Sequence, residues 1–250
     1  MYYYIYDAFV QGSDYVKDLG AIETRLADFG ITGNIGRLSL FRDAGELIAD
    51  EVRRGVKTVV VVGNDATVRK VMGAVVANKA TLGFIPLGKP NTFARLFGVP
   101  YGVAACDVLA RRIVVSLDVG KVNGRYFLSR VCIPEAKISI RCDNNYAVHS
   151  EFGGKMQVRN IGWVSENKEL VELADPRDGM LETVIDARVK RGFFRRSVLK
   201  RSTIPMRTLT IESHQPIQAF VDEEKYAQPR FEISILPQRL RVIAGRERLV

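Results

Sequence analysis

The chain has 250 residues, of which 47% are hydrophobic and 26% charged, and this composition suits one large or two small globular domains rather than a disordered chain. No apolar run approaches the roughly 18–20 residues that a membrane-spanning helix needs, and the N-terminal segment lacks the basic residues of a signal peptide. The formal net charge of +9 predicts attraction to a polyanion, without choosing among nucleic acid, anionic lipid and a polyphosphate ligand.

The cysteines and histidines argue against several kinds of metal site and against a catalytic triad. Cys106, Cys132 and Cys142 show neither a CxxC pair nor zinc-ligand spacing, so we expect buried free thiols in a reducing cytoplasm. The two histidines leave little room for a histidine metal site or a Ser-His-Asp triad.

The first half of the chain alternates between strand-like and helical segments. The expected strands are Tyr2–Tyr6, Ile35–Leu40, Thr58–Val62 and Thr81–Ile85. The expected helices follow Ser13, Asp43 and Pro90 or span Val68–Ala77, with Gly30 and Gly55 just beyond the ends of the first two. This order predicts a doubly wound α/β domain over residues 1–112, with the β-branched Thr58–Val62 as a buried central strand.

The pattern changes near Arg112. Ile113–Val122 and Arg125–Ile133 are apolar runs joined by Asn123-Gly124, the strongest short hairpin signal. Further strand-like segments follow to the C-terminus with few helical patterns between them, of which Phe193–Lys200 is the best candidate for a helix. Residues 113–250 are therefore expected to form an antiparallel β-sandwich.

A polar turn follows the central strand. Gly63 ends the strand, and Asp65 and Thr67 precede a helix, at the edge where open α/β sheets bind ligands. Backbone N–H groups at such a helix start suit a phosphate, and Asp65 suits Mg²⁺ or a hydroxyl proton. The alternative is that Asp65 or Thr67 only caps the helix.

A second loop, Pro86-Leu-Gly-Lys-Pro-Asn-Thr-Phe-Ala-Arg95, follows the next strand. Gly88 allows a tight turn, and Lys89 and Asn91 are placed to reach phosphates or ribose, although the segment is not a Walker A loop. The alternative is an ordinary connection with a helix that Pro90 begins.

The two loops together resemble the diacylglycerol-kinase-type lipid kinases, which include bacterial lipid kinases and sphingosine kinases. Their pattern is GGDGT after a strand, then P-x-G-T-x-N-D-F-A-R after the next, and this chain has Gly63-Asn-Asp-Ala-Thr67 and the Pro86–Arg95 loop in that register. The similarity continues through the 117–128 hairpin, Asp178-Gly-Met-Leu-Glu182 and Val221-Asp-Glu-Glu224.

The resemblance implies an ATP- and Mg²⁺-dependent kinase of a lipid hydroxyl, such as that of diacylglycerol, with a cleft between the two domains and a tail from about Ile243 that returns to the first domain. It assigns catalysis to Asp65, Asp222 and Glu224, nucleotide binding to Gly63, Asn64, Thr67, Gly88, Lys89 and Asn91, and a structural Mg²⁺ to Asp175, Asp178 and the backbone of Met180.

Several ligand-facing positions depart from the family pattern. Asn64 and Ala66 replace two glycines of GGDGT, Lys89 replaces a threonine, Glu223 replaces the glycine of D-G-E, and the first strand leads into Asp7-Ala-Phe-Val-Gln-Gly12 instead of a phosphate loop. Side chains at glycine positions restrict close approach of a phosphate to the backbone. A catalytically impaired relative that binds nucleotide or lipid is therefore a second hypothesis, and a soluble-substrate kinase similar to NAD kinases is a third.

Arg188–Arg201 contains no acidic residue and interleaves phenylalanine with arginine and lysine. We expect Arg191, Phe193, Phe194, Arg195 and Arg196 to face an anionic membrane, which would associate a cytoplasmic protein peripherally. The alternative is a solvated basic face whose aromatic residues belong to the core. No nucleic-acid-binding signature accompanies the charge, and whether the chain forms a homodimer is left open.

Overall fold

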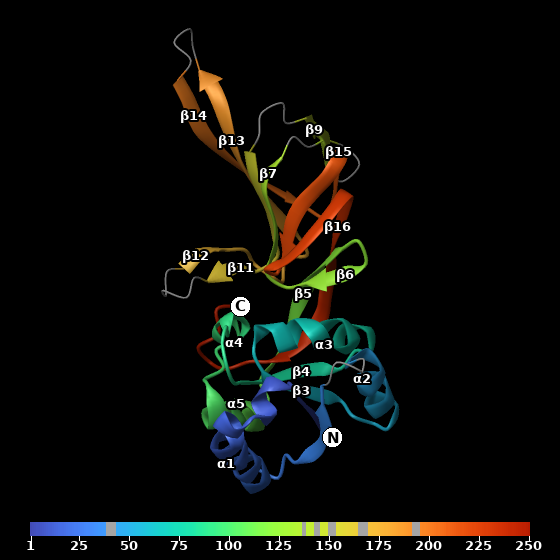
Figure 1. Ribbon diagram of the computed structural model, residues 1–250, viewed down its shortest axis with the longest axis vertical. Coiled ribbons are helices and arrows are strands. Elements are labelled where there is room, and N and C mark those ends of the chain that lie inside the picture. Colours follow the sequence, from blue (N-terminus) through green and yellow to red (C-terminus); the bar gives the residue numbers. More distant parts are fainter. Residues whose placement is uncertain (39–43, 137–138, 143–145, 150–153, 165–169, 192–195) are drawn as a thin grey trace. The chain divides into compact units, whose positions relative to one another are not determined.

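The computed structural model describes residues 1–38, 44–136, 139–142, 146–149, 154–164, 170–191 and 196–250 (Figure 1). The chain divides into two compact units. The first consists mainly of Met1–Leu117 and Arg239–Val250, and the second of Asp118–Trp163 and Lys168–Gln238. The domain limits 1–112 and 113–250 stay a prediction.

The first unit is built on a parallel sheet with the order β2 (Gly33–Arg37), β1 (Tyr2–Tyr6), β3 (Thr58–Gly63), β4 (Thr81–Pro86). The end of β16 (Glu224–Ile243) adds a further parallel strand beside β4. All residues of β3 are buried, because a central strand between two helical layers is covered on both faces.

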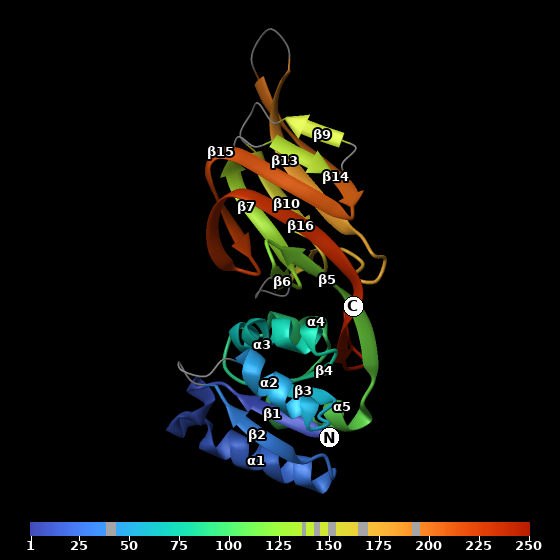
Figure 2. The ribbon, with the colours of Figure 1, turned by 90° about the vertical axis from the view of Figure 1, so that its right-hand side faces the viewer.

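Helices cover both faces of this sheet, as the doubly wound prediction requires. α2 (Ala44–Arg53) and α3 (Asp65–Ala77) pack together on one face, and α1 (Val16–Asp28) and α5 (Ala105–Arg111) pack on the other (Figure 2). The short helix α4 (Thr92–Leu96) follows β4. The predicted α/β class of the first half is confirmed.

Three local predictions for the first unit need correction. Ser13 does not cap α1, which begins at Val16; Val16 itself is exposed, and the buried face carries Ile22 and Leu26. β2 ends at Arg37 rather than at residue 40, while the predicted cap Asp43 lies outside the described residues. Pro90 does not begin α4, which begins at Thr92 because a neighbouring carboxylate caps it there.

The second unit is antiparallel and β-rich. Its main path of paired strands is β14 (Arg196–Met206), β13 (Leu181–Arg191), β10 (Gly154–Arg159), β7 (Arg130–Ala136), β15 (Thr208–Val221) and β16. β8 (Ser139–Cys142) pairs with β15 and with β9 (Tyr146–His149), and β5 (Val114–Val122) pairs with β6 (Arg125–Phe127). β11 (Gly162–Val164) and β12 (Leu170–Leu173) form a separate pair.

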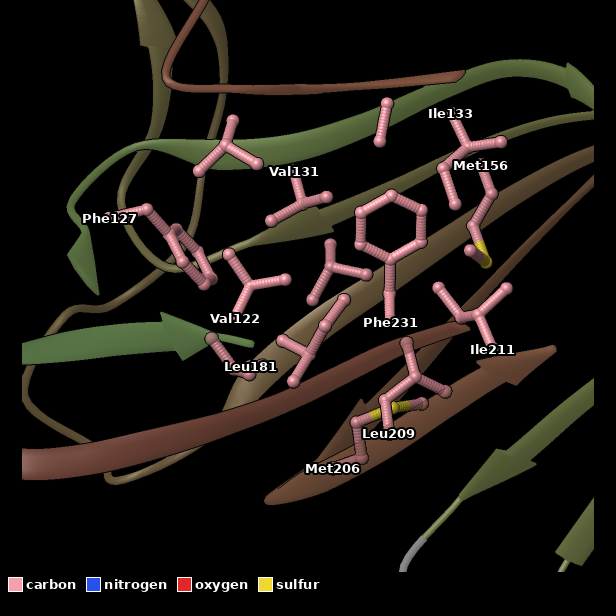
Figure 3. Packing of buried hydrophobic residues seen from close by; sticks show 14 of the residues in the cluster. Val122, Phe127, Val131, Ile133, Met156, Leu181, Met206, Leu209, Ile211 and Phe231 are labelled. Atoms are coloured by element: carbon pink, nitrogen blue, oxygen red, sulfur yellow. The ribbon is translucent and has the colours of Figure 1, made fainter. Parts of the chain in front are cut away.

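One apolar core holds these strands together. Phe231, Val131 and Met156 point toward one another from three different strands, and Phe127 and Leu181 close one side of the cluster (Figure 3). Burial of apolar side chains from every long strand stabilises the sheet roughly in proportion to the area removed from water.

The hairpin at Asn123-Gly124 is confirmed, with φ of 44° and 86° at the two turn residues, as a type I′ turn requires. The predicted strand Arg125–Ile133 breaks after Phe127, because the next N–H groups bond to the carboxylate of Asp222.

The predicted helix Phe193–Lys200 is wrong. Residues 196–200 belong to β14, which pairs with β13 over its whole length, with Arg191 opposite Arg196; residues 193–195 lie outside the described residues. A complete antiparallel ladder outweighs the weak local helical spacing.

Cys106 and Cys132 are free thiols, with Cys106 buried and Cys132 partly so, while the side chain of Cys142 is not described. Among the described residues, no helix combines the length and the apolar character needed to cross a bilayer.

Candidate functional site

The sheet brings the two predicted loops together at the carboxyl ends of β3 and β4. Gly63 and Pro86 are paired neighbours at the ends of these strands. The Leu87 N–H donates to the Gly63 carbonyl at 2.7 Å, and the Asn64 side-chain amide donates to the Lys89 carbonyl at 3.0 Å. The loops 63–67 and 88–91 therefore form one structural site, at the edge where α/β sheets bind ligands.

Asn64 closes the start of α3. Its side-chain oxygen accepts from the N–H groups of Ala66 at 3.0 Å and Thr67 at 3.3 Å, and the Thr67 hydroxyl accepts from the Asn64 N–H at 3.1 Å. This is a reciprocal capping box.

The remaining amide donors of the first turn are also paired. The Asp65 N–H donates to the Pro90 carbonyl at 3.0 Å, and the Val68 N–H donates to the Asn64 carbonyl at 3.1 Å. Helix starts bind phosphate through N–H groups that have no partner within the protein. Here each of those groups bonds to the chain itself.

A buried carboxylate reinforces this closure. Asp7, at the end of β1, is 5% exposed, and its Oδ2 accepts from the Thr67 hydroxyl at 2.8 Å. The Lys70 ammonium lies 3.3 Å from the same oxygen. The chain therefore places its own anion beside the positive end of the α3 dipole.

Asp65 caps the other helix of the site. Its two carboxylate oxygens accept from the backbone N–H groups of Thr92 at 2.7 Å and Phe93 at 3.0 Å, and its side chain is 3% exposed. Burial raises the pKa of this carboxyl, while the two N–H groups act in the opposite direction. The predicted capping of α3 by Asp65 is therefore wrong, because Asp65 caps α4, whereas Asn64 caps α3 and Thr67 completes the capping box.

Gly63 and Gly88, the two glycines that match the family pattern, are required by close packing. A Cβ on Gly63 would lie 2.3 Å from the Thr67 hydroxyl oxygen. Gly88 has φ of 72°, and a Cβ there would lie 2.6 Å from the Phe9 ring. Both positions therefore require glycine for reasons internal to the fold.

A pocket of about 390 Å³ lies beside the second loop. Its polar and charged lining comes from Lys89, Asn91, Thr92, Arg95 and Tyr101. The Asn91 side-chain oxygen is buried and has no hydrogen-bond partner among the residues that the structure describes. The two cations suit an anionic ligand, whereas the Asn91 oxygen is an acceptor and would need a donor group on the ligand.

In the second unit, Asp222 organises the β15–β16 turn. Its oxygens accept from the N–H groups of Leu128 at 2.7 Å, Ser129 at 2.8 Å and Arg130 at 3.0 Å, and the residue is 3% exposed. Glu223 follows with φ of 75° and pairs with Arg130 at 3.0 Å. Three backbone bonds to one buried carboxylate give Asp222 a structural role.

Glu224 is different, because its side chain is exposed and accepts from the Tyr226 hydroxyl at 2.6 Å. Asp222 and Glu224 belong to the second unit, and Asp65 belongs to the first.

The predicted structural metal site lies on a surface turn. Asp175 and Asp178 are exposed and bond to the N–H groups of Arg177 at 3.0 Å and Met180 at 2.8 Å. Below them, the buried Asp118 accepts from the Gly179 N–H at 2.7 Å and fixes the turn.

Asp65 and Asp222 do not fit a magnesium ion as they are arranged, while the site at Asp175, Asp178 and the backbone of Met180 stays a prediction. Magnesium requires oxygen ligands open to the ion and its waters. Asp65 and Asp222 are buried and accept backbone N–H groups on both oxygens. Across the described part of the chain, no three acidic, histidine or cysteine side chains form a metal cluster.

The basic segment forms a β-hairpin where the sequence predicted a helix. Arg191 and Arg196 are paired at the ends of β13 and β14, and Phe193, Phe194 and Arg195 lie outside the described residues. Membrane contact by this segment stays a prediction.

Two site residues were missed by the sequence assignments. Asp7 ends the first strand at the ligand-binding edge, and this position was the available signal. Asp118 interrupts the apolar run Leu117-Asp-Val, and an acid inside a strand indicates a buried hydrogen-bonded role.

The fold is an α/β unit followed along the chain by a β-rich unit, with two loops together at the carboxyl ends of β3 and β4. A family model described as "Diacylglycerol kinase catalytic domain" matches residues 3–122. This match spans 120 of the 250 residues, and similar curated proteins are named as a probable lipid kinase and a diacylglycerol kinase.

Curated relatives match over part of their length. A probable lipid kinase YegS-like from Pseudomonas aeruginosa is 36% identical over 89 residues, and a diacylglycerol kinase from Bacillus subtilis is 33% identical over 91 residues. Each alignment spans 35% of this chain and 30% of the relative.

Solved structures match the whole fold. A diacylglycerol kinase from Bacillus anthracis has a TM-score of 0.79 at 19% identity and covers 98% of this chain and 97% of its own. A putative diacylglycerol kinase from the same organism has a TM-score of 0.80 at 18% identity, with the same coverage. The arrangement of the two units' elements is therefore that of this structural class.

Proposed function

We propose that this protein is a diacylglycerol-kinase-type protein that binds nucleotide or lipid without efficient phosphoryl transfer. The observation that carries the proposal is the closed first turn of α3. Its N–H groups bond to Asn64 and Pro90, so a phosphate has no open donors to occupy.

Asp7 adds an electrostatic barrier to the same position. Two unit charges about 4 Å apart interact by roughly 4 kcal/mol at an effective dielectric constant of about 20. The neighbouring Lys70 offsets part of this repulsion, but its side chain is 56% exposed and solvent screens it. A phosphate at the start of α3 would therefore be bound weakly.

Phosphoryl transfer depends on positioning and on stabilisation of charge rather than on covalent chemistry by the protein. The carboxylates that the family pattern assigns to this task, Asp65 and Asp222, are held by two and three backbone N–H groups. Either would have to leave these bonds before it met a ligand, so slow or absent turnover follows.

A second candidate is an active ATP- and Mg²⁺-dependent kinase that phosphorylates a diacylglycerol-like lipid hydroxyl. The pocket beside Lys89 and Arg95 favours it, because two cations at the end of β4 suit nucleotide phosphates. In this candidate, Glu224 is the assigned acid whose carboxylate is already exposed.

One assay separates the two candidates. Purified protein is incubated with labelled ATP, Mg²⁺ and a mixed lipid extract, beside Asp65→Asn. The proposal expects no label in the organic phase. Label that the parent produces and Asp65→Asn does not produce would refute it and establish the second candidate.

A reversion variant tests directly whether the capped start of α3 limits nucleotide binding. Asp7→Asn/Asn64→Gly/Ala66→Gly removes the carboxylate and the capping side chain and restores the family glycines. We expect ATP to raise the melting temperature of this variant more than that of the parent. The exposed change Asp14→Asn serves as the matched charge control. An equal shift in all three proteins would show that the start of α3 is not what limits nucleotide binding.

For membrane contact, the proposal is peripheral association through the β13–β14 hairpin. Arg191→Glu/Arg196→Glu should lose co-sedimentation with phosphatidylserine vesicles, because each basic residue near an anionic surface contributes about 1 kcal/mol. Unchanged co-sedimentation would show that the hairpin does not contact the membrane surface.

A further inference from the structure

A second hollow lies on the first unit, away from the capped start of α3. We call it the tail pocket, because the C-terminal residues Ala244–Leu249 form one wall. The other walls come from the 94–100 segment and from the end of α5 with Ile113, and its volume is about 560 Å³. This volume lies within the range of small-molecule sites.

The wall formed by the tail is held by three backbone hydrogen bonds. The N–H groups of Ala244, Gly245 and Leu249 donate to the carbonyls of Ile113 at 2.9 Å, Phe97 at 2.8 Å and Leu96 at 2.9 Å. These bonds fix the tail to two different segments of the unit.

Two glycines allow this close contact. A Cβ on Gly98 would lie 2.6 Å from the Arg248 backbone nitrogen, and a Cβ on Gly245 would lie 1.9 Å from the Gly98 carbonyl oxygen. The pocket is therefore formed before any ligand arrives, which lowers the ordering cost of binding.

The lining is basic at its rim. Arg95, Arg111 and Arg246 contribute three guanidinium groups against the single carboxylate of Glu247. Within the described ranges, neither Arg111 nor Arg246 forms an ion pair, and both side chains are exposed. Arginine binds phosphate with bidentate geometry and is the side chain best suited to an anionic head group.

The interior is apolar. Ala94, Val99, Val108, Ile113 and Leu249 line it, and Leu249 is 40% exposed although it is a large aliphatic residue. A bare inorganic anion would leave this surface in contact with water. A ligand with an anionic head and an apolar chain would cover it.

We propose that the tail pocket binds a phosphate monoester that carries a short aliphatic chain. The phosphate lies between Arg111 and Arg246, and the chain lies along Val99, Val108 and Leu249. Of the two family loops, only Ala94 and Arg95 line the tail pocket, and both also line the pocket beside the second loop. The remaining lining belongs to neither loop, so this site goes beyond the proposed function.

Octyl phosphate is a suitable probe, with inorganic phosphate and octanol as the separate halves of the same ligand. Isothermal titration calorimetry without ATP should show saturable one-to-one binding of octyl phosphate to the parent and weaker binding of either half. Arg111→Gln and Arg246→Gln should each weaken it roughly tenfold, the usual size of a charge-assisted hydrogen bond. Glu247→Gln should tighten it.

Arg53→Gln is the matched control, because it removes the same charge from an exposed position on α2 that does not line the pocket. If Arg53→Gln weakened octyl phosphate binding as much as the pocket variants do, the proposed site would be refuted. The binding would then reflect general attraction of an anion to a basic protein. Inorganic phosphate binding as tightly as octyl phosphate would overturn the amphiphile assignment. Because no nucleotide is present, neither outcome depends on whether the protein transfers phosphate.

Discussion

Asp65→Asn distinguishes a structural cap from a catalytic acid, because the two roles predict different effects on stability. The substitution preserves size and shape but removes the charge and one of the two acceptor oxygens. If Asp65 faced a ligand, the substitution would hardly change the free energy of unfolding. Since both oxygens accept from the start of α4, we expect a clear loss of stability.

The magnitude follows from the two bonds at 2.7 and 3.0 Å to Thr92 and Phe93. A hydrogen bond to a charged group contributes roughly 1.5–3 kcal/mol, and a buried N–H without an acceptor costs about 1–3 kcal/mol. Asparagine keeps one acceptor, and its neutral side chain avoids the burial of a charge. The net destabilisation should be about 2 kcal/mol, or a melting temperature roughly 4–8 °C lower.

Urea unfolding of the parent, Asp65→Asn and the exposed control Asp14→Asn measures this difference. Burial raises the pKa of Asp65, so its contribution is fully present below the ordinary value of 3.8 and is lost as the pH rises through the folded-state pKa. The stability of the parent relative to Asp65→Asn should therefore be greatest below pH 3.8 and decline as the pH rises. A stability change below about 0.5 kcal/mol at every pH would refute the capping role.

Three further outcomes follow from the same structure. Asp222→Ala should destabilise the protein by about 3–5 kcal/mol in chemical denaturation, because three buried N–H groups lose their acceptor; an effect under 1 kcal/mol would contradict this. Gly98→Ala should release the C-terminal tail and speed its cleavage in limited proteolysis, since φ is 65° and the new Cβ would meet the Arg248 backbone; an unchanged cleavage rate would show that the tail is not held there. Burial raises the pKa of Cys106 to about 11, so roughly one thiol in a thousand is ionised at pH 8; rapid alkylation of Cys106 in the native protein, detected by mass spectrometry, would contradict its burial.

The sequence by itself predicted the elements whose patterns are local. After Thr58, the β-branched run Val59–Val62 has no polar residue to place on a surface, so only a strand covered on both faces accommodates it. Asn123-Gly124 forms its turn because both residues tolerate positive φ. The sequence also predicted that the loops after β3 and β4 lie together, because neighbouring parallel strands end at the same edge of a sheet.

The sequence was wrong where long-range pairing outweighs local preference. Residues 196–200 form a strand because β13 offers a complete ladder, and α4 starts after Pro90 because Asp65 caps it. Neither partner is visible from the segment alone.

The acidic residues of the site show the division most clearly. The sequence determined that Asp65 lies at the ligand-binding edge, because strand and loop order place it there. Only the tertiary structure decided what its carboxylate contacts. Thr92 lies 27 positions further along the chain and Asp7 lies 60 positions before Thr67, so these bonds exist only after β1, β3 and β4 have paired. A hydrogen bond depends on distance in space, and the sequence records distance only along the chain.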